Sequence, residues 1–336
     1  MKWFSACFTV MMALFSLSAF GQTVKIKGEY HGNLNLDLTD NGHDGTEAAF
    51  QTTRMYVTAE AALNKMFSFR TTLDFGNFTG DATGLENPLF GYIKYAYVQI
   101  EPMKGLKLRF GQQATPWIGA MDNVMGYRYV YKTGLDYFKL GDSADTGFSV
   151  LGEAMDGIIA YQAGVFNGVG YKTAAEGETL PNLKVMGRLS VYPMATQKNS
   201  PLSRMGLHLY GETDAIEEGD DTVRGMMYGA ALSFNHKYVD FLVEFMMRSS
   251  DADGDGGGMI LAPYLKLKYE QWSAFATYSM YKEDGADDTW TRIIAGGTWD
   301  YSKKFALSLN YQMVTSKKHT SDSDTSGIFL NVLAKF

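Results

Sequence analysis

The sequence has little of what soluble enzymes and electron carriers use. Its single cysteine, Cys7, lies within the first 21 residues. Once that segment is removed, the chain has no disulfide, no thiolate nucleophile and no cysteine-ligated metal or haem. Proline is rare, with 7 residues in 336, and segments with the i, i+3, i+4, i+7 apolar spacing of an amphipathic helix are almost absent. These absences argue against a helical enzyme and exclude a CxxCH electron carrier.

The first 21 residues have the features of a secretory signal peptide. Lys2 precedes an apolar stretch from Trp3 to Leu17, and small residues, Ala19 and Gly21, stand three and one positions before a cut at Gln22. A transmembrane anchor needs about 20 apolar residues, and serine and threonine interrupt this shorter run. We therefore expect residues 1–21 to be a signal peptide and residues 22–336 to be exported.

The rest of the chain lacks long apolar runs and instead alternates apolar and polar residues with a period of two. In residues 24–38, valine, isoleucine, tyrosine and leucine share one parity, and charged or amide residues share the other. Because successive side chains of a strand point to opposite faces, one face is apolar and the other is wet. The pattern predicts sixteen strands: 23–38, 48–63, 66–75, 92–100, 106–112, 145–152, 157–166, 183–192, 205–213, 225–234, 238–248, 258–269, 271–281, 289–299, 305–314 and 327–336.

The length, number and connections of these strands favour an outer-membrane barrel. Most span about ten residues, as transmembrane strands do, whereas strands of soluble sandwiches usually have about five or six. Their number is even, and long connections alternate with short ones, as in bacterial barrels. We predict that residues 22–336 form an all-β fold, a transmembrane antiparallel β-barrel of about 16 strands, in the bacterial outer membrane. Segment 193–204 is long for a periplasmic turn, and segment 92–100 fits either facing.

The last predicted strand ends on an aromatic residue. Ile328, Leu330, Val332, Ala334 and Phe336 share one parity. In a closed barrel this strand pairs with the first. An alternating apolar ending on phenylalanine resembles the recognition signal of the barrel assembly machinery, so we expect Phe336 to face lipid and to act as an insertion signal.

Three segments resemble the phosphate-selective porin O and P family. They are QTTRMYVTAEAALNKMFSFRTTLDF (51–75), GLKLRFGQQATPWI (105–118) and IAYQAGVFNGVG (159–170). The resemblance implies a homotrimer of water-filled pores, each with a basic, arginine-lined lumen and a loop folded inward to narrow it. Small anions or other hydrophilic solutes would pass. We expect outer-membrane lipid and lipopolysaccharide around the barrel, and neither a cofactor nor a nucleic-acid partner.

The residues on the polar face of the predicted strands indicate a net basic lumen, although the formal net charge of the chain is −7. Its candidate pore-lining bases are Arg54, Arg70, Lys107, Arg109, Lys184, Arg188 and Arg292. The presumed outer loops are rich in aspartate and glutamate. Because a narrow, water-poor constriction focuses the field, we expect the basic wall to outweigh the acidic mouth and to favour anions, including phosphate-like ones. A non-selective or cation-preferring general diffusion porin is the alternative.

The longest predicted outer loop, 113–144, carries Arg128, Lys132 and Lys139 among aromatic residues. In one interpretation it folds into the lumen as a constriction and offers these bases to anions. In the other it is an outer cap or trimer contact, in which Asp122, Asp136 and Asp142 neutralise them. The sequence leaves both interpretations open.

Other motifs are weaker. Asp251, Asp253 and Asp255 begin like a calcium-binding loop, but Ala262 stands where that loop needs a glutamate. The segment is either a solvated acidic loop or a weak divalent-cation site that bridges to lipopolysaccharide. The five histidines lack ligand spacing, and no motif signals a serine hydrolase, so we expect no metal site and no enzyme. A surface adhesin and a barrel that sheathes a separate cytochrome stay open as less favoured alternatives.

Overall fold

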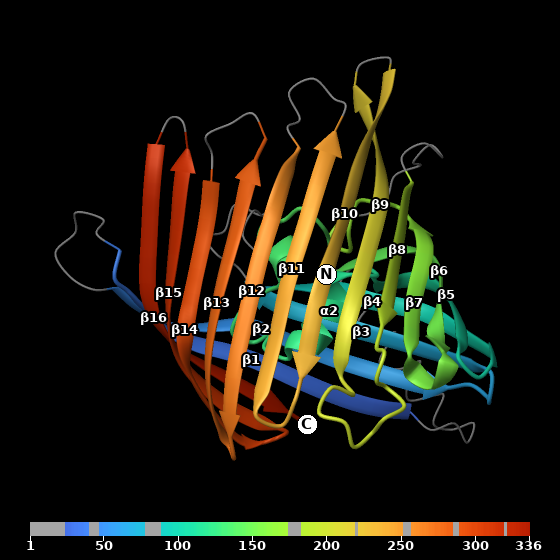
Figure 1. Cartoon of the computed structure of the whole chain (residues 1–336), viewed down its shortest axis with the longest axis horizontal. Coiled ribbons are helices and arrows are strands. Elements are labelled where there is room, and N and C mark those ends of the chain that lie inside the picture. Colours follow the sequence, from blue (N-terminus) through green and yellow to red (C-terminus); the bar gives the residue numbers. More distant parts are fainter. Residues whose placement is uncertain are drawn as a thin grey trace, which may run out of the picture.

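The computed structural model describes residues 24–39, 47–77, 89–173, 183–218, 221–250, 257–284, 289–318 and 321–336. Within these ranges sixteen antiparallel strands follow one another in chain order and close into a single barrel (Figure 1). The predicted all-β barrel of about 16 strands is confirmed. The predicted signal peptide and the aspartates 251, 253 and 255 lie outside the described residues.

The strands are β1 Val24–Asp37, β2 Glu47–Ala62, β3 Phe67–Asn77, β4 Leu89–Met103, β5 Leu106–Ala114, β6 Ala144–Ala154, β7 Ile159–Phe166, β8 Lys184–Val191, β9 Met205–Glu218, β10 Asp221–Asn235, β11 Val239–Ser250, β12 Gly258–Tyr269, β13 Trp272–Glu283, β14 Thr289–Ser302, β15 Phe305–Lys318 and β16 Ser321–Lys335. The helical elements are α2 Ile118–Met125, α3 Gly134–Tyr137 and the 3₁₀ turn η1 Met155–Gly157. None of the helices in the described part of the chain has the length and apolar character to cross a membrane.

The first and last strands close the barrel in a defined register. Glu29 pairs with Lys335 and Asp37 pairs with Gly327. Phe336 extends this ladder, because its amide donates to the Gly28 carbonyl at 3.0 Å and its carbonyl accepts from the Gly28 amide at 3.2 Å. The Phe336 ring covers Gly28 so closely that a Cβ there would lie 1.8 Å from a ring carbon. Closure leaves no strand edge, which a hydrocarbon environment requires.

The outward-facing parity of the strands carries exposed apolar side chains. They include Ile26, Met55, Phe110, Val185, Leu209, Leu232, Leu265, Ile293, Leu309 and Leu330. Trp272 and Tyr301 are exposed beside the short turns at one end of the barrel. An apolar band with aromatic residues at its margin is the surface that a lipid bilayer requires.

Two predicted outer loops are shorter than expected, because the strands beside them continue. β9 and β10 remain paired up to Glu218 and Asp221, and β15 and β16 up to Lys318 and Ser321. Glu218 and Asp221, which the sequence assigned to an outer loop, therefore belong to the end of a hairpin whose strands stay paired. The alternation of apolar and polar residues weakens where both faces of a strand become polar. The sequence pattern therefore ends before the hydrogen-bonded strand pairing does.

Strand β4 contains the irregularity that made its facing ambiguous. Thr72 pairs with Tyr95 and Leu73 pairs with Ile93, so Lys94 is an extra residue in β4. Lys94 and Tyr95 both line the interior, whereas Ile93 and Val98 are exposed on the outside. A bulge that inserts one residue reverses the parity on either side of it. Neither facing could therefore fit the whole segment.

Candidate permeation path

The connection between β5 and β6, residues 115–143, folds into the barrel (Figure 1). Its backbone is held by polar groups of the opposite wall. Asn235 Nδ2 donates to the Val124 carbonyl at 3.0 Å, and Arg292 Nη2 donates to the Lys132 carbonyl at 2.8 Å. The hydroxyl groups of Tyr127 and Ser273 lie 2.9 Å apart. We call residues 115–143 the inner loop.

Glu244 of β11 ties two points of the inner loop to the wall. Its Oε1 accepts from Trp117 Nε1 at 2.9 Å, and its Oε2 accepts from the Gly134 amide at 3.1 Å. The Glu244 side chain is buried, at 2% exposure. Trp117 precedes α2 and Gly134 begins α3, so one carboxylate fixes both helical turns.

Apolar packing holds the inner loop over its whole length. One continuous cluster joins Trp117, Ile118, Met121, Met125 and Leu135 to the inward side chains of strands β9–β15, which include Leu242, Met246, Ile260, Tyr264, Phe275 and Ile294. Burying each such side chain contributes roughly 1.5–3 kcal/mol. The inner wall of this half of the barrel therefore carries an apolar surface beside polar groups such as Glu244 and Ser273, and the loop covers it.

Two cavities adjoin the inner loop on the side away from the apolar cluster. The first, of about 730 Å³, is lined by residues near the chain ends, including Lys27, Leu333 and Lys335. The second, of about 610 Å³, is lined by residues toward the opposite end, including Asn33, Thr53 and Lys172. We call them the terminal-side cavity and the outer cavity. Arg128 and Tyr129 line both, so the tip of the inner loop stands at their junction.

The predicted bases distribute between these cavities. Arg70, Arg109 and Arg188 line the terminal-side cavity, and Arg54, Lys132, Lys139 and Arg292 line the outer cavity. Lys184 lines a smaller cavity of about 180 Å³ together with Lys139. Lys107 lines neither the terminal-side nor the outer cavity, and its Nζ lies 3.9 Å from Glu101.

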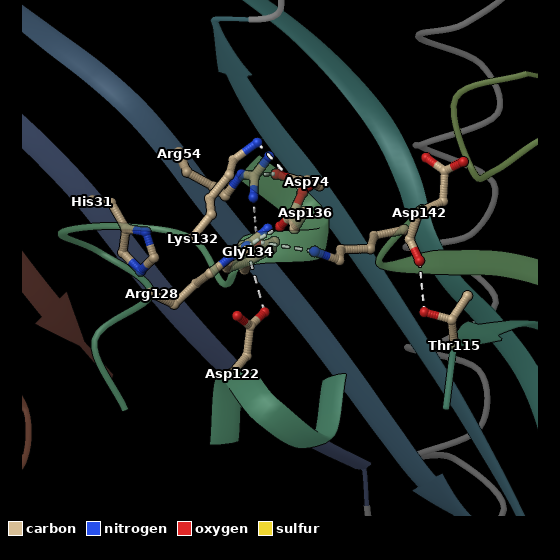
Figure 2. Close-up of polar contacts among 12 residues, drawn as sticks. His31, Arg54, Asp74, Thr115, Asp122, Arg128, Lys132, Gly134, Asp136 and Asp142 are labelled. Atoms are coloured by element: carbon tan, nitrogen blue, oxygen red, sulfur yellow. Dashed lines mark hydrogen bonds and ion pairs between the residues drawn. The ribbon is translucent and has the colours of Figure 1, made fainter. Parts of the chain in front are cut away.

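An ion-pair cluster at the junction neutralises part of this charge (Figure 2). Arg128 pairs with Asp136 and, at 3.4 Å, with Asp122. Lys132 lies 3.5 Å from Asp136, and Arg54 lies 3.2 Å from Asp74. The loop therefore folds inward, and aspartates pair with two of its three bases, Arg128 and Lys132.

Burial shapes the protonation of the loop groups. It lowers the pKa of Lys132 to about 8, although Asp136 opposes the shift. Burial would raise the pKa of Asp136, but Arg128 and Lys132 outweigh it and hold that pKa well below its usual range. Burial also opposes the charge on Arg128, yet Asp122 and Asp136 raise the pKa of Arg128 well above its usual value. The guanidinium at the junction is therefore permanently charged.

Other wall arginines are held by neutral groups. Arg109 Nε donates to Gln99 Oε1 at 2.9 Å, and its guanidinium lies 4.8 Å from the Tyr97 ring centre. Arg188 Nε donates to the Pro116 carbonyl at 2.9 Å. Arg292 lies 3.5 Å from the Tyr137 ring centre. Among the residues that the structure describes, no carboxylate lies within 4 Å of these three guanidinium groups.

The sequence profile of the Gram-negative porin family matches residues 8–332. This chain belongs to that family. It is a porin of the bacterial outer membrane, a channel for small solutes and not an enzyme. The predictions of location and of a non-enzymatic channel are confirmed. The resemblance of three segments to a porin is thus confirmed at the level of the Gram-negative porin family, and the phosphate-selective O and P assignment is not confirmed.

Solved porins and channels share the fold of this porin. The anion-selective porin from Comamonas acidovorans has 15% identity and a TM-score of 0.64, over 94% of this chain and 100% of that one. The channel DcaP of Acinetobacter baumannii has 13% identity and a TM-score of 0.68, over 94% and 97%. OmpF of Salmonella typhi, solved with daunomycin, has 9% identity and a TM-score of 0.65, over 94% and 98%. No curated protein matches the sequence.

Two further basic residues of the porin were missed at the sequence level. Lys94 lines the terminal-side cavity and Lys172 lines the outer cavity. The bulge in β4 hid the facing of Lys94, and Lys172 follows β7 in a stretch without alternation. The clustering of lysine and tyrosine in 92–97 was the available signal for Lys94.

Proposed function

We propose that this porin prefers anions among the small solutes that it passes. The observation that carries the proposal is the excess of basic side chains around the two cavities. Seven bases and three acids line the terminal-side cavity, and six bases and two acids line the outer cavity, with Arg128 in both sets. Positive potential in a confined, low-dielectric lumen concentrates anions there and excludes cations.

The way the bases are held supports the same conclusion. A base in a salt bridge contributes little net charge to the lumen, whereas one that lies on a tyrosine ring keeps its full charge. Arg109, Arg188 and Arg292 have neutral partners. Arg70 is held both by the Tyr95 ring, whose centre lies 5.0 Å from its guanidinium, and by an ion pair with Glu60 at 3.7 Å. Stacked guanidinium groups leave N–H donors at their edges for oxyanions.

Two finer properties belong to the proposal. One structural neighbour is described as an anion-selective porin, which agrees with the sign that we propose. Phosphate-like anions are candidate solutes, because a guanidinium fork matches a phosphate as well as a carboxylate. We further propose a homotrimer surrounded by lipid and lipopolysaccharide, since a trimer form is described for a neighbour, OmpT of Vibrio cholerae, with 15% identity and a TM-score of 0.62, over 94% of this chain and 99% of that one.

Targeting completes the proposal. Residues 1–21 would be removed as a signal peptide, and Phe336 would be read by the barrel assembly machinery. Gel electrophoresis of cross-linked protein would test the trimer, and N-terminal sequencing of the mature protein would test the cut at Gln22. A mature chain that begins at Met1 would contradict the signal peptide.

The test of the proposed function is the reversal potential of the purified porin in a planar bilayer under a potassium chloride gradient. We expect a potential of the sign set by chloride. Adding phosphate then distinguishes two kinds of anion channel. A block of the current at low phosphate concentration indicates a phosphate-binding channel, and an unblocked current indicates a general anion porin. A potential set by potassium would contradict the proposal and favour the cation-preferring alternative.

A further inference from the structure

Lys94 occupies an unusual position in the wall. It is the extra residue of the bulge in β4, which brings two successive side chains, Lys94 and Tyr95, to the interior. The Lys94 side chain is only 4% exposed, yet it lines the terminal-side cavity. A regular strand would turn one of the two neighbours toward lipid. The bulge is therefore what allows a buried ammonium beside an aromatic ring of the same strand.

Three tyrosine rings surround this ammonium. Its Nζ lies 5.0 Å from the ring centre of Tyr56, 5.5 Å from that of Tyr171 and 5.9 Å from that of Tyr95. Such faces carry partial negative charge and attract a cation without cancelling its net charge. Within the described residues the ammonium makes one hydrogen bond, to Tyr56 Oη at 3.2 Å. Its other two N–H donors have no hydrogen-bond partner among the described residues.

The charged side chains near Lys94 form ion pairs with one another, whereas Lys94 does not pair with a carboxylate. Arg54 pairs with Asp74, and Arg128 and Lys132 share Asp122 and Asp136. Those three bases and three acids sum to zero. In the part of the chain that the structure describes, no carboxylate lies within 4 Å of Lys94. Lys94 adds one formal positive charge to these six groups.

Lys94 also lies where the two cavities meet. Tyr56, which contacts it, lines the terminal-side cavity, and Tyr171, which also contacts it, lines the outer cavity. Arg128, which lines both cavities, belongs to the same cluster. A solute that crosses from one cavity to the other passes this group of charges. Bulk salt screens a charge poorly when it is buried.

We propose that Lys94 is a specificity-determining residue, the caged and unpaired charge that anions meet at the junction of the two cavities. The inference rests on the proposed anion preference and assigns a large part of it to one side chain. The tyrosine cage fixes the ammonium in place, and the balanced ion pairs around it hold the wall in shape. Wall bases in salt bridges contribute less to selectivity than this one does.

The test compares Lys94→Met with Lys107→Met in the potassium chloride gradient. Both variants remove one lysine charge from adjacent strands, but Lys107 pairs with Glu101 and lines neither cavity. We expect Lys94→Met to move the reversal potential toward the potassium value by clearly more than Lys107→Met does. Lys94→Arg should keep the wild-type value, because a guanidinium also fits an aromatic cage.

The outcomes separate this inference from the proposed function. A wild-type potential set by potassium overturns both. An anion-selective wild type with equal shifts in Lys94→Met and Lys107→Met overturns the role of Lys94 alone. A difference in electrophoretic migration between unheated and heated protein checks that each variant forms the barrel. If Lys94→Met does not, Lys94→Gln, which keeps a hydrogen-bond donor for Tyr56, is measured in its place with the same expected shift.

Discussion

Trp117 donates its indole N–H to Glu244 at 2.9 Å inside the barrel, between residues 127 positions apart in the chain. The second oxygen of Glu244 accepts the amide of Gly134. A single carboxylate thereby holds the start of both helical turns of the inner loop. The loop's position, and with it the place of Arg128 between the two cavities, depends on this contact and on the apolar cluster beside it.

Glu244→Ala should loosen the inner loop. It leaves two buried donors without an acceptor, at a cost of about 1–3 kcal/mol each. We expect a changed single-channel conductance and more frequent current fluctuations in planar bilayers. Glu244→Gln keeps one acceptor oxygen and should be intermediate. Glu101→Ala removes a carboxylate that lines neither cavity and should behave as wild type. Quiet wild-type currents from Glu244→Ala would show that the apolar cluster alone holds the loop.

The anion preference should fall in mildly alkaline solution. Burial lowers the pKa of Lys132 to about 8, so its ammonium is charged below that pH and loses its proton as the pH rises through it. The outer cavity then loses one positive charge. Because Lys132 pairs with Asp136, reversal potentials measured between about pH 7 and pH 9 should drift only slightly toward the potassium value. Lys132→Arg keeps its charge over this range and should flatten the profile. Identical profiles in both proteins would assign the drift to another group.

The contact between Phe336 and Gly28 should matter for assembly. A Cβ at Gly28 would lie 1.8 Å from the Phe336 ring, so Gly28→Ala displaces that ring from the closing strand pair. We expect less heat-modifiable protein in the outer membrane. Gly211→Ala is the matched control, because a Cβ there meets nothing within 4 Å. Equal yields of the two variants would mean that closure tolerates a displaced ring.

The insertion signal itself has a separate test. Phe336, which is exposed and also adjoins the terminal-side cavity, is the residue that we expect to face lipid at the end of the closing pair. Phe336→Asp places a charge there, which costs on the order of 1 kcal/mol near the interface. That cost alone is modest, so near-complete loss from the outer membrane and accumulation in the periplasm would indicate lost recognition. Wild-type surface levels would contradict the signal.

Alternation predicted the strands well, because each strand has lipid on one side and this constraint acts on every second residue. It failed at Lys94, where the bulge changes the parity in mid-strand. It also stopped short in β9 and β15, where the ends of the hairpins project beyond the alternating segments. An alternation with a period of two indicates the part of a strand that contacts lipid. It does not predict how far the strand continues beyond that contact.

The inner loop was only partly predictable. The sequence located it between β5 and β6 and named its bases, but did not decide its direction. A usable signal lay elsewhere in the chain. Leu242 and Met246 of β11 are apolar on the parity that should face water, and both are buried against the loop. Apolar residues on both parities of a strand indicate that something covers the inner face. One interpretation of the sequence named Asp122, Asp136 and Asp142 as counter-ions of the three bases, and the structure assigns the first two to Arg128, from different turns of the loop.

The central claim is that bases lining the cavities without carboxylate partners set the anion preference. The most direct measurement compares the reversal potential of Arg109→Ala/Arg188→Ala with that of Lys107→Ala/Lys268→Ala, which removes two bases that pair with carboxylates and line neither cavity. Both double variants lose two positive charges. We predict that the arginine variant shifts strongly toward the potassium value while the lysine variant stays near wild type. Equal shifts, or no shift in the arginine variant, would contradict the claim.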